Sequence, residues 1–331
     1  MQCAVMGAGA WGSALGDLLA CGGHTVHIWA LEPDVVRSIN ERHENSVFLP
    51  GFKLAPSLIA THDHREALSG AKLVVYATPS QHLRGVARAG SAHVARDTVL
   101  AVASKGIEES TLALMSDVVS EEVKGRPVVA ISGPSFAAEV AARQPTAIVA
   151  ASQDADAARV AQDVLSTSTF RVYTHDDLVG VELGGALKNV MAVATGMVEG
   201  VGLGNNSRAA LITRGLAEMT RLGVALGARQ ATFAGLAGIG DLVLTCTGAL
   251  SRNRAVGVEV GKGKTLAEAL AGKQTVAEGV VTTKSALALA KREGVEMPIA
   301  TMVYRILFDG HPAKSAVPEL MARGLRAEQD E

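Results

Sequence analysis

The chain has 331 residues, of which 48% are hydrophobic and 19% charged, so it is long enough for two domains and apolar enough for a sizeable core. This composition excludes disorder over most of the length. The formal net charge of -2 gives no electrostatic basis for binding nucleic acid or an anionic membrane. Cys3, Cys21 and Cys246 are isolated, which argues against disulfides and a zinc site and is typical of a reducing, cytoplasmic compartment.

Neither a leader nor a membrane anchor is expected. The first predicted strand begins at residue 2, which leaves no room for a signal peptide. No apolar run approaches the ~18 residues that are needed to cross a bilayer. We therefore expect no membrane span.

The first dozen residues predict a dinucleotide-binding turn. The apolar run 2–6 is typical of a strand, and residues 13–20 have a helical pattern. Between them Gly7, Gly9 and Gly12 form G-x-G-x-x-G in the strand–turn–helix context that the motif requires. Gly7 allows the tight turn, Gly9 lets a pyrophosphate approach the backbone, and Gly12 lets the helix pack against the strand.

A second strand over residues 25–30 completes a βαβ unit. Glu32 follows just past its end, where an acidic residue can hold a ribose hydroxyl. The alternative is a glycine-rich turn that binds nothing. The complete unit favours a dinucleotide.

Short β-branched runs alternate with helical segments up to about residue 175, as in a parallel sheet buried between helices. The expected strands lie at 58–60, 73–77, 98–103, 128–131, 146–150 and 170–173, and a helix at 34–42. Ligands of such sheets bind beyond the carboxyl ends of the strands. Pro79, Lys105, Gly133 and Ser135 are therefore expected at the same edge as Gly9.

Helical spacing dominates from about Asp176 onward, over 178–197, 207–226, 276–292 and 297–307, and no strand is expected there. We predict an α/β chain in which a Rossmann-type doubly wound sheet over residues 1–178 is followed by an all-α substrate domain over residues 179–331. A continuous helix, and not a flexible linker, is expected to join them.

Lys188 lies in an otherwise small and apolar helical run. One interpretation is a surface lysine whose ammonium group reaches solvent. The other is a buried lysine whose lowered pKa suits proton transfer. The adjacent Gly184 and Gly185 would let a ligand or another backbone approach that face, but the pattern alone leaves the two interpretations about equal.

Two further charged residues are candidates. Lys105 follows a strand end, which favours a role at the sheet edge over that of a solvated loop lysine. Asp241 follows the glycine-rich stretch 235–240, which is unsuited to a helix interior. Asp241 is interpreted either as a helix N-cap or as an acceptor for Lys188 or a substrate hydroxyl.

Ser251, Arg252 and Asn253 open another predicted helix. Ser251 suits the N-cap, whereas a basic residue in the first turn opposes the helix dipole. A bound anion would remove this conflict, since arginine and helix N-termini both bind phosphate. The alternative is a basic surface turn. His62 and His64 are interpreted as a solvated loop, so no metal is expected.

Together these motifs resemble the bacterial NAD(P)-dependent glycerol-3-phosphate dehydrogenases over nearly the whole chain. The carrying stretches are GAGAWGSALG from Gly7, ASKGIE from Ala103, ISGPSFAAEV from Ile131, GVELGGALKNVMA from Gly180, RAALITRGLAEMTRLG from Arg208, GLAGIGDLVLTC from Gly235, SRNR from Ser251 and VEMPI from Val295. The resemblance implies reversible hydride transfer between NAD(P)H and dihydroxyacetone phosphate, which gives sn-glycerol 3-phosphate for phospholipid synthesis. It also implies a homodimer.

By motif position, the resemblance implies a role for each matching residue. Lys188 would be the proton donor and acceptor. Substrate would meet Lys105, Gly133, Ser135, Lys188, Asn189, Asp241, Ser251, Arg252 and Asn253. The cofactor, NAD or NADP, would meet Gly7, Gly9, Ala10, Trp11, Gly12, Leu31, Glu32, Lys105, Ala137, Arg252, Val276 and Glu278.

Two positions depart from the family pattern. Residue 10 is alanine where serine is common, which removes one hydroxyl contact to the pyrophosphate. Residue 31 is leucine where a basic or hydrogen-bonding residue often meets the 2′-phosphate of NADP. With Glu32 adjacent we expect a lean toward NAD, which Arg37 would oppose if it reached the same phosphate.

Two alternative functions remain open. A β-hydroxyacid dehydrogenase of the same two-domain build would act on a carboxylate such as 3-hydroxyisobutyrate. A dinucleotide sensor would bind NADH without turnover. The convergence of Lys188, Lys105, Asp241 and Arg252 argues against a sensor.

Overall fold

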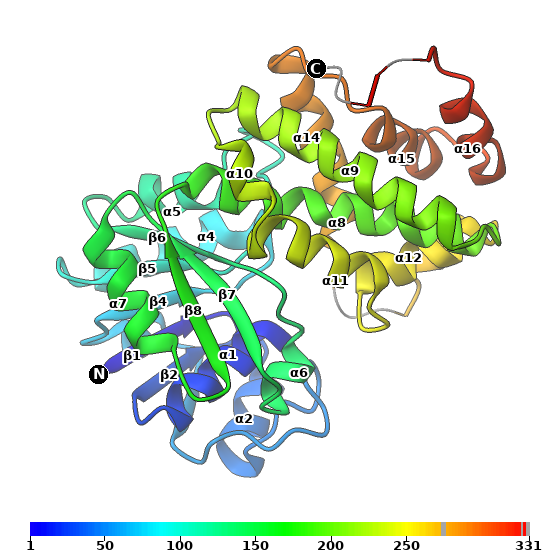
Figure 1. The fold of residues 1–331 in the computed structure, drawn as a ribbon. Helices are drawn as coiled ribbons and strands as arrows, with labels where there is room; N and C mark the ends of the chain where they lie inside the picture. The colour runs from blue at the N-terminus through cyan, green and yellow to red at the C-terminus, as the bar shows by residue number, and fades with distance from the viewer. Residues whose placement is uncertain (273–275, 326, 329–331) are drawn as a thin grey trace. The chain divides into compact units, whose positions relative to one another are not determined.

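The computed structural model describes residues 1–272, 276–325, 327 and 328, and the chain forms two compact units (Figure 1). Unit 1 comprises Met1–Lys105 and Ala113–Glu182, and unit 2 comprises Gly106–Leu112 and Leu183–Glu331. Helix α8 (Leu178–Gly200) begins in unit 1 and continues into unit 2, so an unbroken helix carries the chain across the division.

Unit 1 is built on one eight-stranded sheet with the order β3-β2-β1-β4-β5-β6-β7-β8. The strands are β1 (Gln2–Met6), β2 (Thr25–Trp29), β3 (Leu58–Thr61), β4 (Leu73–Tyr76), β5 (Val99–Val102), β6 (Val128–Ser132), β7 (Thr146–Ala151) and β8 (Phe170–His175). The order of the first six strands is that of a doubly wound dinucleotide-binding sheet. This confirms the predicted fold class.

The expectation of an all-parallel sheet is wrong at β7. The short connection from β6 holds only the five-residue helix α6 (Ala137–Ala141), and β7 returns antiparallel to β6, with Ile131 opposite Ala150. Strand β8 then runs parallel to β7 at the sheet edge. The expectation that every strand is buried on both faces is also wrong for β8, because its residues Arg171 and Tyr173 are exposed.

Helices cover both faces of the sheet (Figure 1). The remaining helical segments of unit 1 are α1 (Ala10–Cys21), α2 (Pro33–Arg42), α3 (His64–Leu68), η1 (Ser80–His82), α4 (Leu83–Gly90), η2 (Ser91–His93), α5 (Met115–Glu122) and α7 (Ala155–Leu165). Alternate residues of β1 enter different cores: Cys3 and Val5 pack with α1 and α7, whereas Ala4 and Met6 pack with α3, α4 and α5. This alternation places an apolar layer on each face of the sheet.

All the regular elements among the described residues of unit 2 are helices, which confirms the all-α prediction. Besides α8 it contains α9 (Asn205–Ala225), α10 (Gln230–Phe233), the π-helical turn η3 (Leu236–Gly240), α11 (Asp241–Thr247), α12 (Arg252–Gly261), α13 (Leu266–Leu270), α14 (Glu278–Arg292), α15 (Pro298–Phe308) and α16 (Ala313–Met321). Helix α8 is the most buried of them, and nearly every residue from 183 to 198 is inaccessible to solvent.

One expectation about membranes needs correction. Helix α8 is long and apolar enough to cross a bilayer. The segments Gln230–Thr247 and Arg252–Gly261 reach that length and hydropathy only when they are taken together, and they are bent by 49° relative to each other. However, 83% of the most apolar window of α8 is buried inside the protein. Its hydrophobicity is explained by its place in the core of unit 2, because a helix that is apolar on all sides is typical of a protein interior.

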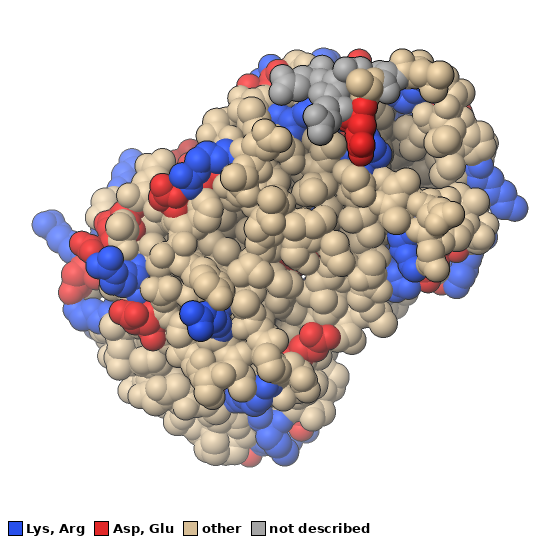
Figure 2. Space-filling view, in the orientation of Figure 1, with Lys and Arg blue, Asp and Glu red and all other residues tan. Residues whose placement is uncertain are grey.

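Charges of both signs are interspersed over the face of the described residues that Figure 2 shows. A typical cluster joins Arg84 and Arg88 of α4 to Glu122 of α5. Hydrogen bonds from Arg88 and Arg84 lower the pKa of the Glu122 carboxyl to about 2. These ion pairs connect α4 to α5 at the surface of unit 1.

A buried carboxylate starts helix α15. Glu218 of α9 accepts hydrogen bonds from the backbone N–H groups of Ile299 and Ala300, at 2.7 and 3.2 Å. It therefore caps a helix to which it does not belong. Burial raises the pKa of Glu218 to about 7, although these two hydrogen bonds and the charges of Arg221 and Arg323 act to lower it.

Glu218→Gln should change stability in a pH-dependent way. The pKa of Glu218 is about 7 in the folded protein, against an ordinary value of 4.5 that applies to the unfolded chain. Between these two values the folded protein binds the proton more tightly, so the free energy of unfolding of wild type falls by roughly 3 kcal/mol as the pH rises from 4.5 to 7. Glutamine does not titrate, so the variant should gain stability relative to wild type between pH 4.5 and 8. Urea unfolding of both proteins measures this difference, and a difference that is independent of pH would contradict a buried carboxyl with a raised pKa.

Candidate functional site

The glycine turn after β1 has the geometry that the motif predicts. Gly7 has a φ of +117°, which strongly favours glycine. A Cβ at Gly12 would lie 1.8 Å from the Gly7 carbonyl oxygen. Any larger residue at 12 would therefore push α1 away from the sheet.

The first turn of α1 offers unpaired donors. Gly9 is its N-cap, and no side chain caps the helix. The space that a Cβ would occupy at Gly9 is open. The buried Trp11 Nε1 has no hydrogen-bond partner among the described residues. An uncapped helix N-terminus beside an open glycine fits the pyrophosphate of a dinucleotide, and Ala10 is the first residue of this turn.

Asn45 supports the turn from the loop after α2, a role that the sequence analysis missed. Its buried amide nitrogen donates to the Ala8 carbonyl at 2.7 Å and to Ser13 Oγ at 2.8 Å. Its amide oxygen accepts from the backbone N–H of Phe48 at 3.0 Å. Nothing in the local pattern distinguishes this residue from an ordinary loop asparagine.

The end of β2 is acidic. Leu31 is 72% exposed, and Glu32 is the N-cap residue of α2 with no side-chain cap bond. Arg37 pairs with Asp34 at 3.7 Å, and both side chains are well exposed. Glu32 is thus the charged residue next to Leu31, and the nearest arginine on α2 is engaged with another carboxylate.

The expected edge residues follow adjacent strands. Lys105 comes three residues after β5, and its ammonium donates to the Gly133 carbonyl after β6 at 3.4 Å. Gly133 has a φ of +141°, and a Cβ there would lie 2.9 Å from Ile148 Cα. Ser135 Oγ donates to the same carbonyl at 3.0 Å, and Ala137 begins α6. Unit 1 thus brings together Lys105, Gly133 and Ser135.

Lys188 is buried, so the interpretation as a solvated surface lysine is wrong. Its side chain lies on α8 and the residue is 7% exposed. Its ammonium donates to Asp241 Oδ1 at 2.5 Å and to Thr245 Oγ1 at 2.9 Å. The paired carboxylate offsets the free-energy penalty of a buried ammonium group.

Asp241 serves as the acceptor for Lys188 and not as a helix cap. It is the first residue of α11 and 1% exposed, while the N-cap position belongs to Gly240. The bent turn η3 precedes it, with non-helical torsions at Gly238. A Cβ at Gly184 would lie 2.4 Å from the Ala237 carbonyl oxygen, so this glycine allows η3 to lie against α8.

Thr245 belongs to the same cluster and was missed from the sequence. It lies one turn after Asp241, donates to the Asp241 carbonyl at 2.6 Å and accepts from Lys188. The i,i+4 spacing from Asp241 is a usable signal, since it places both side chains on one face of α11.

Asn189 and Asn253 join three helices of unit 2. Asn253 Nδ2 donates to Asn189 Oδ1 at 2.9 Å, and Asn253 Oδ1 accepts from the backbone N–H of Gly279 on α14 at 2.9 Å. Both side chains are buried. The residue after Lys188 is therefore tied to the first turns of α12 and α14.

The start of α12 is as predicted at Ser251, which caps the helix by accepting from the Arg254 backbone N–H at 3.2 Å. Desolvation lowers the pKa of the Arg252 guanidinium, and the Glu278 carboxylate opposes this shift. Glu278 begins α14, and Val276 just before it is 42% exposed. The predicted site residues of unit 2 thus lie on α8, on α11, at the start of α12 and at the start of α14, and hydrogen bonds join Lys188 to Asp241 and Asn189 to Asn253.

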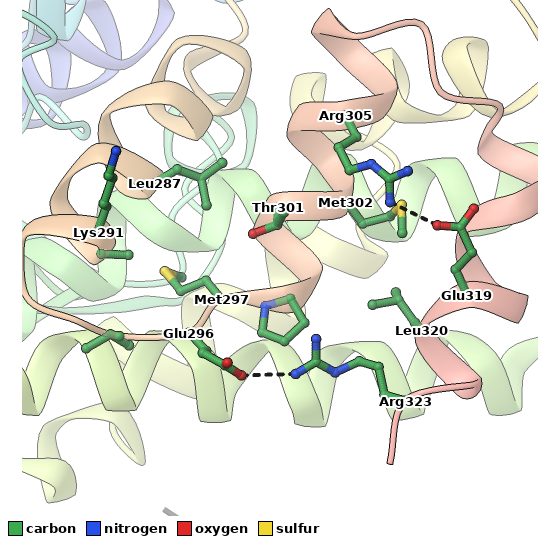
Figure 3. A pocket seen from close by; sticks show the side chains of 13 residues that line it. Leu287, Lys291, Glu296, Met297, Thr301, Met302, Arg305, Glu319, Leu320 and Arg323 are labelled. Atoms are coloured by element: carbon green, nitrogen blue, oxygen red, sulfur yellow. Dashed lines mark hydrogen bonds and ion pairs between the residues drawn. The ribbon is translucent and has the colours of Figure 1, made fainter.

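A separate cavity of about 510 Å³ lies among α14, α15 and α16 (Figure 3). Its arginines are engaged, with Arg305 paired to Glu319 at 2.9 Å and Arg323 to Glu296 at 3.0 Å. None of the predicted site residues lines it. Among the described residues there is also no group of three or more His, Cys, Asp or Glu that could hold a metal ion.

Two family models match the chain. The N-terminal model of the NAD-dependent glycerol-3-phosphate dehydrogenases matches residues 2–158, and the C-terminal model of the same family matches residues 177–318. Together they span both units.

Individual relatives agree with this match. The chain is 54% identical to a glycerol-3-phosphate dehydrogenase [NAD(P)+] of Geobacter sp. (strain M21) over 328 residues, which is 98% of each chain. It is 52% identical to that of Syntrophotalea carbinolica over 333 residues and the whole of both chains. A crystal structure of glycerol-3-phosphate dehydrogenase from Coxiella burnetii superposes with a TM-score of 0.94 at 40% identity, covering 97% of this chain and 99% of the other. The chain therefore belongs to the NAD-dependent glycerol-3-phosphate dehydrogenase family.

Proposed function

We infer that this protein is an NAD(P)-dependent sn-glycerol-3-phosphate dehydrogenase that interconverts dihydroxyacetone phosphate and sn-glycerol 3-phosphate, a precursor of glycerophospholipids. Family membership over the whole chain supports this function. The single observation of the structure that carries it is the buried Lys188 ammonium held by Asp241 and Thr245. A buried lysine at a fixed position is suited to proton transfer.

We propose that Lys188 is the acid of the reduction. The bound nicotinamide supplies the hydride. The Lys188 ammonium donates a hydrogen bond to the substrate carbonyl, stabilises the negative charge that develops on its oxygen, and then gives that oxygen a proton. In the reverse direction neutral Lys188 takes the hydroxyl proton. Asp241 and Thr245 hold the ammonium in one orientation, which lowers the entropy that must be lost in the transition state.

The phosphate of the substrate is assigned to the start of α12. Its positive dipole end, together with the Arg252 guanidinium, favours a dianion. Asn253 ties this turn to Asn189, next to Lys188. Lys105, Gly133 and Ser135 are proposed as further substrate contacts from the edge of the sheet in unit 1.

The cofactor is assigned mainly to residues of unit 1. The uncapped start of α1, with Gly9, Ala10 and Trp11, is proposed to hold the pyrophosphate, and Glu32 to hold the ribose. Further contacts are proposed from Ala137, Lys105, Arg252, Val276 and Glu278. We accordingly propose residues 1–178 as the dinucleotide-binding domain and residues 179–331 as the substrate domain.

The assembly and location are proposed on the resemblance and on composition. The family suggests a homodimer, which light scattering would detect as twice the 34.1 kDa mass of the chain. Cys3, Cys21 and Cys246 are free thiols, and burial raises the pKa of Cys246 to about 12. Cysteines that form no disulfide are typical of a cytoplasmic protein.

The decisive test of the function is oxidation of NADH and NADPH with dihydroxyacetone phosphate. We expect turnover that depends on the phosphorylated ketone. Oxidation of 3-hydroxyisobutyrate with no activity on dihydroxyacetone phosphate would favour a β-hydroxyacid dehydrogenase. NADH binding without turnover on either substrate would favour a sensor.

Lys188→Ala should lower kcat for dihydroxyacetone phosphate reduction by roughly 100-fold or more, because the acid of the reaction is lost. NADH binding should persist, since the glycine turn is unchanged. Steady-state kinetics and fluorescence titration with NADH measure the two quantities.

A matched lysine provides the control. Lys291 lies exposed on α14 and away from the Asp241 cluster, so Lys291→Ala should retain the wild-type kcat. Unchanged turnover in Lys188→Ala would remove the proposed role from this residue.

Cofactor preference should follow the charge at the end of β2. Wild type is expected to have a higher kcat/KM with NADH than with NADPH, because Glu32 repels a 2′-phosphate and Leu31 offers it no hydrogen bond. Glu32→Gln should lower the ratio of kcat/KM with NADH to kcat/KM with NADPH, because it should raise kcat/KM for NADPH. A wild-type preference for NADPH would overturn this assignment.

A further inference from the structure

Helices α8 and α12 touch through their backbones. A Cβ at Gly196 would lie 2.1 Å from the Arg254 carbonyl oxygen, and one at Gly200 would lie 2.2 Å from that of Val258. The contact is reciprocal, because a Cβ at Gly257 would lie 2.1 Å from the Val193 carbonyl oxygen. Real Cβ atoms do not approach other atoms this closely, so only glycine suits these positions.

The two helices run parallel in this contact. Gly196 of α8 faces Gly257 of α12, and four residues further along both helices Gly200 faces Gly261. A Cβ at Gly261 would lie 2.4 Å from the Met197 carbonyl oxygen. Each helix thus presents glycines at i and i+4, one above the other, to the partner helix. This spacing fixes both the position of α12 along the axis of α8 and the distance between the two helix axes.

The parallel direction brings the N-terminal end of α12 beside the middle of α8. Asn253, four residues before Gly257, donates to Asn189, seven residues before Gly196. The first turn of α12 therefore lies beside the turn of α8 that carries Lys188. The glycine contact and the asparagine bridge are independent observations that give the same direction of α12 along α8.

We propose that Gly196, Gly200, Gly257 and Gly261 are positioning residues, which set the distance between the Lys188 ammonium and the phosphate-binding first turn of α12. This proposal rests on the function inferred above. In the substrate, covalent bonds limit the distance between the carbonyl and the phosphate. The backbone contact between α8 and α12 holds the Lys188 ammonium and the first turn of α12 at a distance that suits both groups. Larger residues would leave each group able to bind but would place the carbonyl wrongly against Lys188.

An added methyl group at Gly257 has nowhere to go. The Val193 carbonyl belongs to the buried backbone of α8, so α12 must move away by about 1 Å to restore an ordinary contact. A displacement of that size near a reacting centre lowers rates by on the order of 100-fold. Lys188 stays in place in this variant, because its ligands Asp241 and Thr245 belong to α11.

The test compares a substrate with its phosphate and one without. Gly257→Ala should lower kcat/KM for dihydroxyacetone phosphate by about 10-fold to 100-fold. It should leave kcat/KM for dihydroxyacetone within about 2-fold of wild type, because that ketone makes no use of α12. Gly261→Ala, at the far end of the same contact, provides a second variant if the first does not fold, and the same selective loss is expected.

Gly223→Ala is the matched control. Its Cβ would meet the Phe233 ring at 2.2 Å, so it strains the core of unit 2 without touching α12. Its unfolding midpoint should fall, whereas the ratio of kcat/KM between the two ketones should stay at the wild-type value. An equal loss of kcat/KM on both ketones in Gly257→Ala and Gly261→Ala, or no loss on either ketone, would overturn the proposal.

The wild-type reaction separates this proposal from the function on which it rests. If wild type does not reduce dihydroxyacetone phosphate, the proposed function fails, and the positioning role fails with it. If wild type reduces it and the glycine variants keep the wild-type ratio, only the positioning role fails.

Discussion

A buried ammonium group is the constraint on which unit 2 depends. Lys188 lies in the middle of the long, buried and apolar helix α8, and its charge is tolerated there because Asp241 and Thr245 accept its hydrogen bonds. The neighbouring helices are arranged so that these partners can reach it. Gly184 lets η3 lie against α8, which sets the start of α11 and the position of Asp241. The packing of unit 2 and the proton transfer that we propose for Lys188 therefore depend on the same arrangement.

Unit 1 contributes a different kind of site, made mostly of backbone. The turn at Gly7 and Gly12 brings the uncapped start of α1 to the carboxyl edge of the sheet, and the Asn45 amide donates a hydrogen bond to the Ala8 carbonyl. Backbone N–H groups and a helix dipole suit a pyrophosphate, whereas a movable proton requires a side chain. The division of labour in this dehydrogenase follows that distinction, with cofactor binding assigned chiefly to unit 1 and proton transfer to unit 2.

The sequence was informative wherever the signal was local. Strand positions, the glycine turn and the cap at Ser251 all follow from patterns within a few residues. The direction of β7 could not be predicted in this way, because a short apolar run looks the same in either orientation. The bridge from Asn253 to Asn189 joins residues 64 positions apart, and Asn45 acts on a turn 37 positions away, so neither leaves a local trace. The depth of Lys188 was equally ambiguous until its carboxylate partner was placed.

Chemical rescue tests the central claim most directly, that the buried Lys188 ammonium donates a proton to the substrate oxygen. Removal of this side chain in Lys188→Ala leaves space beside Asp241 that a small alkylammonium ion can enter. Methylammonium should restore dihydroxyacetone phosphate reduction in a saturable way, whereas tetramethylammonium, which carries charge but no N–H, should not. Equal rescue by both ions, or no rescue by methylammonium in a variant that still binds NADH, would contradict a proton transfer from residue 188.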